Sequence, residues 1–528
     1  MVQYRMCELC FSGEKLEKQG NWAAVELKAE FVCGENRQCV VGFYAGNGVY
    51  KVRFLPDQAG MWTYRISGCI QEEGLIKVLP AEENARIQEN RVGDRKLRHH
   101  GMVMAEQHHF RHQDGTLFYP FGTTVYALLH QEDRLVEQTL ESLAESPFNK
   151  VRFCVFPKHY DFNHNEPPFY AFEKKEDGSW DVSRPCFAFW DRLDGVLMRL
   201  EELGIQADLI LFHPYDRWGF SKMSQTDNKT YLDYLLRRLS AMPNVWWSLA
   251  NEYDLCADKT IKDWEEIEAF TAQRDPYHHL LSNHNCFKTW DFSRPDVTHA
   301  SIQTKALTRV AAWRERYGKP VVIDECCYEG NLQHFWGSIS GREMVRRFWR
   351  VVTMGGYCTH GETFLDPENE ILWWSRGGKL KGESPERIGF LRSLMEELPG
   401  PLEPEESDLC RLARMSEADG TGLLEQMDPG FAAFARHVFE MSETERMDFS
   451  ANEFVYQGHC GEEAYLTFYD LRTCVQDVLE LPEEHIYRVE LLDVWEMTRT
   501  ILTEQASGRT ELQLPGKEDM AVLAVRIG

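Results

Sequence analysis

The pattern of hydrophobic and polar residues divides the chain into three regions. In the first, apolar and polar residues alternate in short runs over positions 24–29, 49–54 and 60–66. Such alternation is typical of strands with one buried face, and Gly46-Asn47-Gly48 supplies the residues of a tight turn. Because no convincing helix interrupts these runs, the pattern predicts a β-sandwich over residues 1–95, which ends in a polar, charged segment at 80–98.

The second region, residues 96–400, alternates continuous apolar runs with amphipathic stretches. Continuous runs are typical of strands buried on both faces. One amphipathic stretch runs from Phe189 to Leu203 and ends at Gly204, and another begins with the capping box of Ser340 and Glu343. Eight strands followed by helices predict an α/β fold, a (β/α)8 TIM barrel with its active site at the C-terminal strand ends. The predicted strands are 119–123, 151–156, 207–212, 245–250, 280–283, 300–303, 321–324 and 356–359.

In the third region, residues 401–528, short alternating strands return at 464–469, 487–492 and 520–525. This pattern predicts a second β-sandwich, so we expect a TIM barrel flanked by N-terminal and C-terminal β-sandwich domains. The acidic stretch at 403–408 is interpreted as a solvated loop.

Composition narrows the classes of ligand. The 528 residues include 58 Lys and Arg against 84 Asp and Glu, a formal net charge of −26. This charge argues against nucleic acid and an anionic membrane surface as partners, because both require clustered cations. A neutral ligand is compatible with it, and aromatic residues, 12% of the chain, suit a carbohydrate-binding cleft. The oligomeric state stays open, and a homo-oligomer is compatible with the sequence.

We expect a soluble, cytoplasmic protein. No run of about 18 apolar residues occurs, and the N-terminal residues lack a basic segment followed by an apolar one. The 15 cysteines are scattered through apolar segments rather than spaced as a disulfide framework, which indicates reduced thiols.

Two carboxylates follow predicted strands in positions that suit catalysis. Glu252 comes after Asn251 at the end of the fourth strand, and Glu325 closes the seventh. Hydrolysis of a glycosidic bond requires one carboxyl that protonates the leaving oxygen and one that faces the oxocarbenium-like centre. Asp324 is the rival of Glu325, but neighbouring strand residues point to opposite sides, and the later one is better placed at the rim.

These two roles require different protonation states. With Glu252 as acid/base, its pKa should be raised by the Glu325 carboxylate and by partial burial, whereas hydrogen bonds should keep Glu325 ionised as the nucleophile. A retaining mechanism requires about 5–5.5 Å between the carboxyl groups, and an inverting one about 6.5–9.5 Å.

The chain resembles the large clan of retaining (β/α)8 glycoside hydrolases. In that clan the fourth strand ends in Asn-Glu, the acid/base, and the seventh in Glu, the nucleophile, which here match Asn251-Glu252 and Glu325. The order of domains, with the motifs at 50–54, 60–64 and 121–124, resembles the apiosidase-like family, which carries an immunoglobulin-like N-terminal domain. The resemblance implies a glycosidase acting on a plant- or glycan-derived oligosaccharide. It also implies that Asn251 bonds the sugar 2-hydroxyl.

Other strand ends supply candidates for substrate binding. Arg152 lies in the second strand and could keep the nucleophile ionised, as an arginine does in the clan; a structural ion pair is the alternative. The remaining candidates are His159, His213, Asp216, His284, Gln303 and Trp373. Further polar or aromatic residues near strand ends are Lys158, Tyr160, Tyr215, Asn285, His360, Glu362 and Trp374.

The sequence predicts neither a metal nor a cofactor. The histidine pairs at 99–100 and 108–109 lack ligand spacing with a third ligand, and neither a P-loop nor a dinucleotide-binding motif occurs. Two alternatives to a retaining glycosidase remain: a carbohydrate-binding protein on a barrel without catalysis, and a metal-dependent barrel hydrolase.

Overall fold

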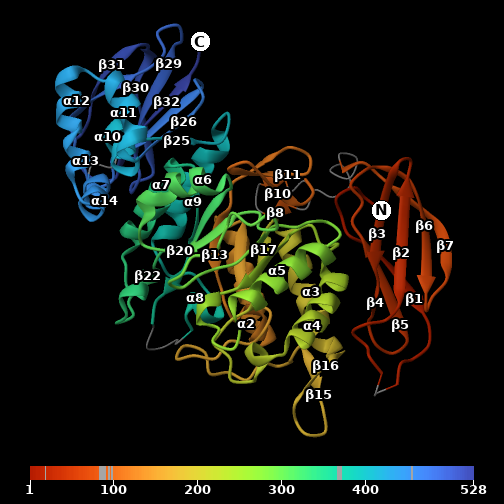
Figure 1. Cartoon of the computed structure of the whole chain (residues 1–528). Helices are drawn as coiled ribbons and strands as arrows, with labels where there is room; N and C mark the ends of the chain where they lie inside the picture. Colours follow the sequence, from red (N-terminus) through yellow and green to blue (C-terminus); the bar gives the residue numbers. More distant parts are fainter. Residues whose placement is uncertain (18–19, 82–90, 93–94, 97–98, 366–370, 453–455) are drawn as a thin grey trace. The chain divides into compact units, whose positions relative to one another are not determined.

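The computed structural model describes residues 1–17, 20–81, 91–92, 95–96, 99–365, 371–452 and 456–528 (Figure 1). The chain forms two compact units. The first comprises residues 1–303, 317–340 and 359–385, and the second comprises 304–316, 341–358 and 386–528. The segment at 80–98 lies mostly outside the described residues, so the boundary at 95 stays a prediction, as does the boundary at 400.

The N-terminal region folds into two antiparallel sheets, as the alternating pattern predicted. Their strand orders are β1-β5-β4 and β3-β2-β6-β7. Phe31 of β2 and Phe54 of β5 stack with ring centroids 4.1 Å apart, so the two sheets share one core. The strands are β1 (Cys7–Ser12), β2 (Leu27–Cys33), β3 (Asn36–Val41), β4 (Phe43–Tyr44), β5 (Val49–Phe54), β6 (Gly60–Gly68) and β7 (Glu72–Val78).

Eight parallel strands form a barrel at the positions of the continuous apolar runs. Their order is β19-β18-β17-β14-β13-β23-β21-β20, and a parallel bridge between His284 and Ser301 joins the two ends and closes the ring. Every residue of β17 and β18 is buried, which explains why these strands show no alternation. The strands are β13 (Phe121–Thr124), β14 (Lys150–Cys154), β17 (Gln206–Phe212), β18 (Val245–Ala250), β19 (Leu281–Ser282), β20 (Ala300–Gln303), β21 (Val321–Glu325) and β23 (Tyr357–His360).

Helices follow the barrel strands along the chain except after β19, where the described residues 283–299 lead to β20 without a helix, unlike the predicted alternation. The predicted helix that ends at Gly204 is α3, and Gly204 has a φ of +70°, which glycine adopts without strain. Of the predicted capping box, Ser340 directly precedes α7 and Glu343 lies in its first turn. The helices are α2 (Asp133–Glu145), α3 (Phe187–Glu202), α4 (Gln225–Leu239), α5 (Ile261–Arg274), α6 (Val310–Tyr317), α7 (Gly341–Thr353), α8 (Trp373–Arg376) and α9 (Ser384–Glu397), with short 3-10 turns η1 (Leu128–His130), η2 (Phe220–Lys222), η3 (Tyr253–Leu255), η4 (Leu307–Arg309) and η5 (Phe335–Gly337).

Short strands accompany the barrel. They are β8 (Arg91–Val92) with β9 (Arg95–Lys96), the sheet of β10 (Val103–Glu106), β11 (His109–His112) and β12 (Leu117–Phe118), the hairpin of β15 (Phe172–Lys174) and β16 (Trp180–Pro185), and the parallel pair of β22 (Glu329–Gly330) and β24 (Glu362–Thr363).

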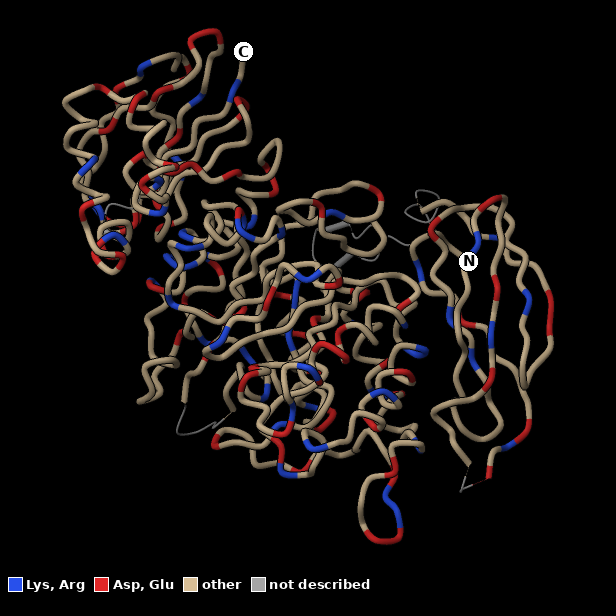
Figure 2. The backbone as a smooth tube through the Cα atoms, viewed as in Figure 1, with Lys and Arg blue, Asp and Glu red and all other residues tan. Residues whose placement is uncertain are grey.

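Charged residues are interspersed along the whole backbone (Figure 2), but a few lie inside the barrel. Lys150 of β14 places its Nζ 2.8 Å from Asp208 Oδ2 and 2.7 Å from Asp324 Oδ1, and all three side chains are buried. Arg152 adds longer ion pairs, 3.4 Å to Asp208 and 3.7 Å to Asp324. Because β14 and β21 are not neighbours in the sheet, the contacts with Asp324 cross the barrel interior.

The network assigns Asp324 to the barrel interior. Its carboxylate also accepts hydrogen bonds from Ser301 at 2.5 Å and Thr359 at 2.8 Å. Burial raises the pKa of Asp324, but Lys150 and Arg152 hold it well below its ordinary value. The rival of Glu325 is therefore a structural ion-pair partner.

The C-terminal part of the second unit contains a six-stranded sheet, of order β25-β26-β27-β32-β29-β30, and the pair β28-β31. Residues of both sheets share one apolar core, including Leu479, Leu512, Val489 and Val522, as a β-sandwich requires. The strands are β25 (Glu403–Glu405), β26 (Tyr456–Cys460), β27 (Ala464–Phe468), β28 (Gln476–Glu480), β29 (Tyr487–Asp493), β30 (Thr498–Ala506), β31 (Arg509–Gln513) and β32 (Met520–Arg526).

Two details of the prediction for this region are wrong. The acidic stretch is not a loop throughout, because β25 pairs with β26 and Asp408 begins a helix. Between β25 and β26 lie five helices that the strand pattern did not predict, although Ser407, Ser416 and Asp428 are N-caps of the first three. They are α10 (Asp408–Arg414), α11 (Glu417–Gln426), α12 (Pro429–Ala435), α13 (His437–Glu440) and α14 (Glu443–Asn452). Among the described residues, no helix has the length and apolarity that crossing a membrane requires.

We predict that Lys150→Met lowers the free energy of unfolding by about 3–5 kcal/mol. The substitution leaves Asp208 and Asp324 buried without the cation that pairs with both. Urea unfolding monitored by fluorescence measures the change. Arg65→Met is the matched control, since Arg65 pairs with Glu73 at the surface, where both side chains are about two-thirds exposed. The control should change the free energy of unfolding by less than about 1 kcal/mol. Equal effects of the two substitutions would contradict the importance of the network.

Candidate active site

The two predicted catalytic carboxylates lie at the C-terminal ends of their strands. Glu325 is the last residue of β21, and Glu252 follows β18 by two positions. Their exposed fractions are 4% and 6%. Glu252 has φ 54° and ψ 56°, a left-handed conformation that costs a non-glycine residue about 1–2 kcal/mol. Such strain is found where the surrounding structure fixes a functional side chain.

A chain of hydrogen bonds connects the two carboxylates. The Tyr126 hydroxyl contacts both Glu325 Oε1 and, at 3.0 Å, Asn251 Oδ1. The Asn251 amide then donates to Glu252 Oε2 at 3.1 Å, and the Tyr215 hydroxyl donates to the same oxygen. Five residues at or just after the ends of β13, β17, β18 and β21 thus form one site, because these hydrogen bonds connect all of them.

Cationic and polar groups surround Glu325. Arg152 Nη1 lies 3.9 Å from Glu325 Oε1, and His284 Nε2 lies 4.0 Å from the same oxygen. With its amide nitrogen turned toward the carboxylate, Gln303 donates to Glu325 Oε2 at 3.3 Å. The structure therefore brings Arg152, His284, Gln303 and Asn251 together with the carboxylate pair.

Burial and charge set the protonation of this site. Burial, and then the Glu252 carboxylate, raise the pKa of Glu325 to about 7, while Arg152 and Tyr126 act in the opposite direction. The repulsion between the two carboxylates therefore raises the pKa of Glu325, so the prediction that hydrogen bonds keep this carboxyl ionised and that the raised pKa lies at the other one is wrong. Burial, together with Arg152, lowers the pKa of His284 well below its ordinary value, so its imidazole is neutral.

A lysine lies beside the pair in a cage of aromatic rings. Lys158 is 2% exposed, and its Nζ lies 3.4 Å from the ring centroid of Tyr126, 4.2 Å from that of Tyr215 and 4.8 Å from that of Tyr160. Among the described residues, no side chain forms a hydrogen bond or ion pair with this ammonium group. Burial lowers the pKa of Lys158. The ammonium group is held by rings and stays available to a ligand.

Four predicted binding residues are not in contact with the pair. Asp216 accepts backbone hydrogen bonds from Trp218, Gly219 and Ser221, so its carboxylate holds a turn. His213 Nε2 lies 3.1 Å from a backbone carbonyl, and the His159 ring contacts His164 and Trp218. The remaining one is Trp373, whose indole donates to Thr123 Oγ1 at 2.8 Å.

Its neighbour Trp374 lies in the aromatic cage instead. The Trp374 ring centroid lies 5.8 Å from that of Tyr126 and 5.3 Å from that of Tyr160. Trp373 was a predicted binding residue, whereas Tyr126 was not. Tyr126 comes two positions after β13, and a search that included every polar residue just past each strand would have found it.

The carboxylate pair is separate from the groups that could hold a metal. Within the described ranges, two sets of at least three ligand-type side chains lie close together: Glu329, His360 and Glu362, which are buried, and Glu462, Glu484 and His485, which are mostly exposed.

Family models match three parts of the chain. Residues 104–399, more than half of it, match the apiosidase-like catalytic domain. Residues 1–68 match a domain of unknown function, DUF5060, and residues 453–527 match another, DUF5605. None of the curated proteins matches the chain.

Solved structures resemble the chain over most or all of its length. A protein from Bacteroides vulgatus ATCC 8482 described as a putative glycoside hydrolase is 33% identical, with 100% of this chain and 99% of that one covered and a TM-score of 0.82. A glycoside hydrolase family 5 structure from the same strain is 15% identical over 81% and 94% of the two chains, with a TM-score of 0.56, and is similar in fold alone.

The barrel, the carboxylates at its fourth and seventh strand ends and these matches agree with one another. The chain belongs to the apiosidase-like family of glycoside hydrolases.

Proposed function

We propose that the protein is a retaining glycosidase that cleaves a plant- or glycan-derived oligosaccharide, with Glu325 as nucleophile and Glu252 as acid/base. The hydrogen-bonded chain from Glu252 through Asn251 and Tyr126 to Glu325 is the observation that carries the proposal. It supports two carboxylates acting on one sugar. The fifteen cysteines of the sequence support a reducing compartment, and we propose a cytoplasmic enzyme.

The proposed reaction has two displacements. A Glu325 oxygen forms a bond to the anomeric carbon as the glycosidic C–O bond breaks, and the leaving oxygen takes the proton of Glu252. Water then gives a proton to Glu252 and attacks the anomeric carbon, which releases Glu325 as a carboxylate. Arg152 and Tyr126 stabilise the charge of Glu325 before and after the covalent intermediate.

Polar groups around the pair would bind the sugar. The Asn251 amide is positioned between the two carboxylates and would hold the 2-hydroxyl. Lys158, with no side-chain partner in the described residues, would donate to a substrate oxygen, and Trp374 would cover an apolar sugar face. Gln303 and His284 complete the polar wall beside Glu325.

The proposal predicts that Glu325→Gln lowers kcat/KM by at least about 10³-fold for an aryl glycoside that the wild type hydrolyses, because the nucleophile is lost. Glu252→Ala should slow the hydrolysis of the covalent intermediate by about 10²–10⁴-fold. Rates for a panel of aryl glycosides measure both.

Glu201→Gln is the matched control for these substitutions. Burial also raises the pKa of Glu201 to about 7, but this carboxyl lies on α3, so the control should keep its activity. Carbohydrate binding without hydrolysis by the wild type would favour the non-catalytic alternative. Activity that depends on an added metal would favour the metal-dependent one.

The stereochemistry of the first product tests the mechanism separately. Double displacement returns the anomeric carbon to its original configuration. We therefore expect proton NMR, recorded within the first minutes of hydrolysis, to show the anomer that matches the substrate. The opposite anomer would indicate an inverting enzyme and would contradict the role of Glu325 as nucleophile.

The buried carboxyl of Glu325 also makes stability depend on pH. At pH values between the ordinary pKa of a glutamate and about 7, Glu325 has lost its proton in the unfolded chain but keeps it in the folded chain. The free energy of unfolding therefore falls as pH rises through this window. Glu325→Gln removes this loss of stability, so the variant should gain stability relative to the wild type as pH rises. We expect the gain to be larger at pH 8 than at pH 5 by on the order of 2 kcal/mol.

Thermal unfolding at the two pH values measures this difference. Glu73→Gln is the control, since Glu73 is 70% exposed and should change stability little at either pH. A Glu325→Gln effect that is the same at both pH values would show that Glu325 is not protonated near neutral pH.

A further inference from the structure

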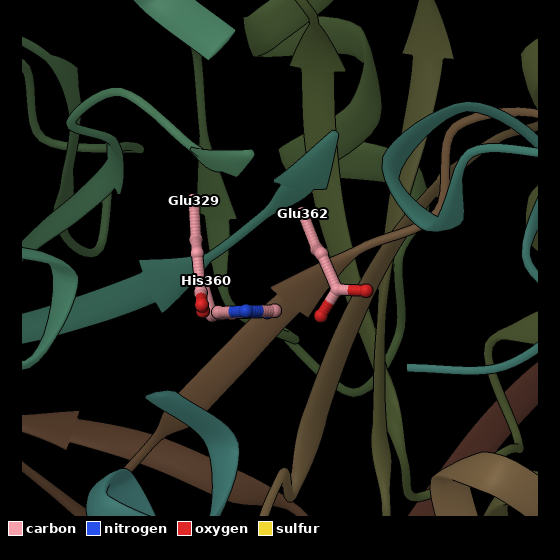
Figure 3. A group of neighbouring side chains, drawn as sticks. All are labelled: Glu329, His360 and Glu362. Atoms are coloured by element: carbon pink, nitrogen blue, oxygen red, sulfur yellow. The ribbon is translucent and has the colours of Figure 1, made fainter. Parts of the chain in front are cut away.

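Three buried ligand-type side chains meet beside the C-terminal ends of the seventh and eighth barrel strands. Glu329 lies in β22, His360 ends β23 and Glu362 begins β24. Their exposed fractions are 1%, 0% and 1%. One ligand atom from each residue lies within 4.8 Å of the other two, and Figure 3 shows the imidazole between the two carboxylates in that view.

The chain segment before α9 holds both carboxylates in place. Four successive backbone N–H groups donate to them: those of Lys381 and Gly382 to Glu362, and those of Glu383 and Ser384 to Glu329. A Cβ at Gly382 would lie 2.4 Å from Glu329 Oε2 and 2.8 Å from Glu362 Oε2, so the main chain passes between the carboxylates. These donors orient the carboxylates. Glu329 Oε2 also accepts the Ser384 hydroxyl at 2.5 Å, so Glu329 Oε1 and both Glu362 oxygens are the ones that keep a lone pair for another partner.

The histidine presents a nitrogen without a partner. His360 Nδ1 lies 3.1 Å from Thr123 Oγ1, and the ring stacks on Phe148 with centroids 4.8 Å apart. His360 Nε2 is buried and has no hydrogen-bond partner. With Nδ1–H donated to Thr123, the Nε2 lone pair is free, and a hydrogen bond of this kind fixes the orientation of metal-bound histidines.

The two carboxylates of the cluster have no cation in direct contact, although the charge of Lys381 acts on Glu362 from farther away. Neither Glu329 nor Glu362 forms an ion pair with Lys or Arg in the part of the chain that the structure describes. Two buried carboxylates so close together repel one another, and burying such charges without a cation is costly. A divalent cation bound by both carboxylates and by Nε2 offsets both costs.

We propose that Glu329, His360 and Glu362 bind one divalent transition-metal ion. Two carboxylate oxygens and one imidazole nitrogen suit Mn²⁺ or Zn²⁺ better than Mg²⁺ or Ca²⁺, which favour oxygen ligands alone. Metal–ligand distances of about 2.0–2.2 Å require the three atoms to approach one another slightly. The sequence showed no such site because its ligands come from two segments without local ligand spacing.

The ion would have a structural role. It would connect the segments after β21 and β23 with the segment that enters α9. The same Thr123 hydroxyl that contacts His360 also accepts the Trp373 indole N–H, and Trp374 follows in the aromatic cage. Metal binding would therefore fix the position of Trp374 relative to the barrel. This inference does not depend on glycosidase activity.

The test is metal binding by the full chain after treatment with EDTA and dialysis. We expect one equivalent of Mn²⁺ or Zn²⁺ by elemental analysis and calorimetry, and a rise in Tm of at least about 3 °C with metal at 100 times Kd. Co²⁺ substitution should give d–d absorption bands typical of nitrogen and oxygen ligands. This readout uses the wild type and does not require that a variant folds.

Two variants locate the site. His360→Phe keeps the ring stacked on Phe148 but removes the nitrogen ligand, and Glu362→Gln keeps an oxygen acceptor but removes the charge. Both should lose the bound equivalent and the rise in Tm. The matched control is His485→Phe in the mostly exposed cluster, which should bind like the wild type.

Three outcomes would overturn the proposal: no binding by the wild type, binding that both cluster variants retain, or binding that only His485→Phe removes. A wild-type Tm that responds to pH but not to any metal would indicate that a proton occupies the cluster.

Discussion

The catalytic end of the barrel depends on the buried charges beneath it. Lys150 neutralises Asp208 and Asp324 across the interior, and Arg152 extends from the same strand toward Glu325. A barrel interior filled only by apolar side chains could not hold an arginine next to Glu325, because the arginine would have no anion on its other side. The ion pairs with Asp208 and Asp324 therefore hold Arg152 in the interior, where it lies next to the carboxylate of Glu325.

Three levels of organisation build the site upon that network. Strand ends deliver Glu252 and Glu325, the left-handed turn at Glu252 aims its side chain, and tyrosine hydroxyls complete the hydrogen bonds. None of these levels suffices alone. The same architecture explains why two carboxylates in sequence have different surroundings: Asp324 is an interior ion-pair partner, and Glu325 lies at the strand end, where we propose that it acts as nucleophile.

Much of the fold follows from the sequence, because a strand buried on both faces has a continuous apolar run and a one-faced strand alternates. The barrel and the sandwich strands were predictable on this basis. The helices from α10 to α14 were not, since that segment is short in apolar stripes and its caps, such as Ser407 and Ser416, were not weighed. Within the site, positions at strand ends were predictable, but side-chain direction was not. Asp216 turns to its own backbone and Trp373 to Thr123, which only the packing of neighbouring loops decides.

Lys158 has a consequence for how this cleft could change. Its ammonium group is held by the faces of Tyr126, Tyr215 and Tyr160 rather than by a carboxylate. Replacing it would leave no orphaned anion, so the cost to folding would be smaller than for Lys150. We expect a single substitution there to change the proposed contact with a sugar and to leave Glu252 and Glu325 in position. The proposed substrate contact can therefore vary independently of the proposed chemistry.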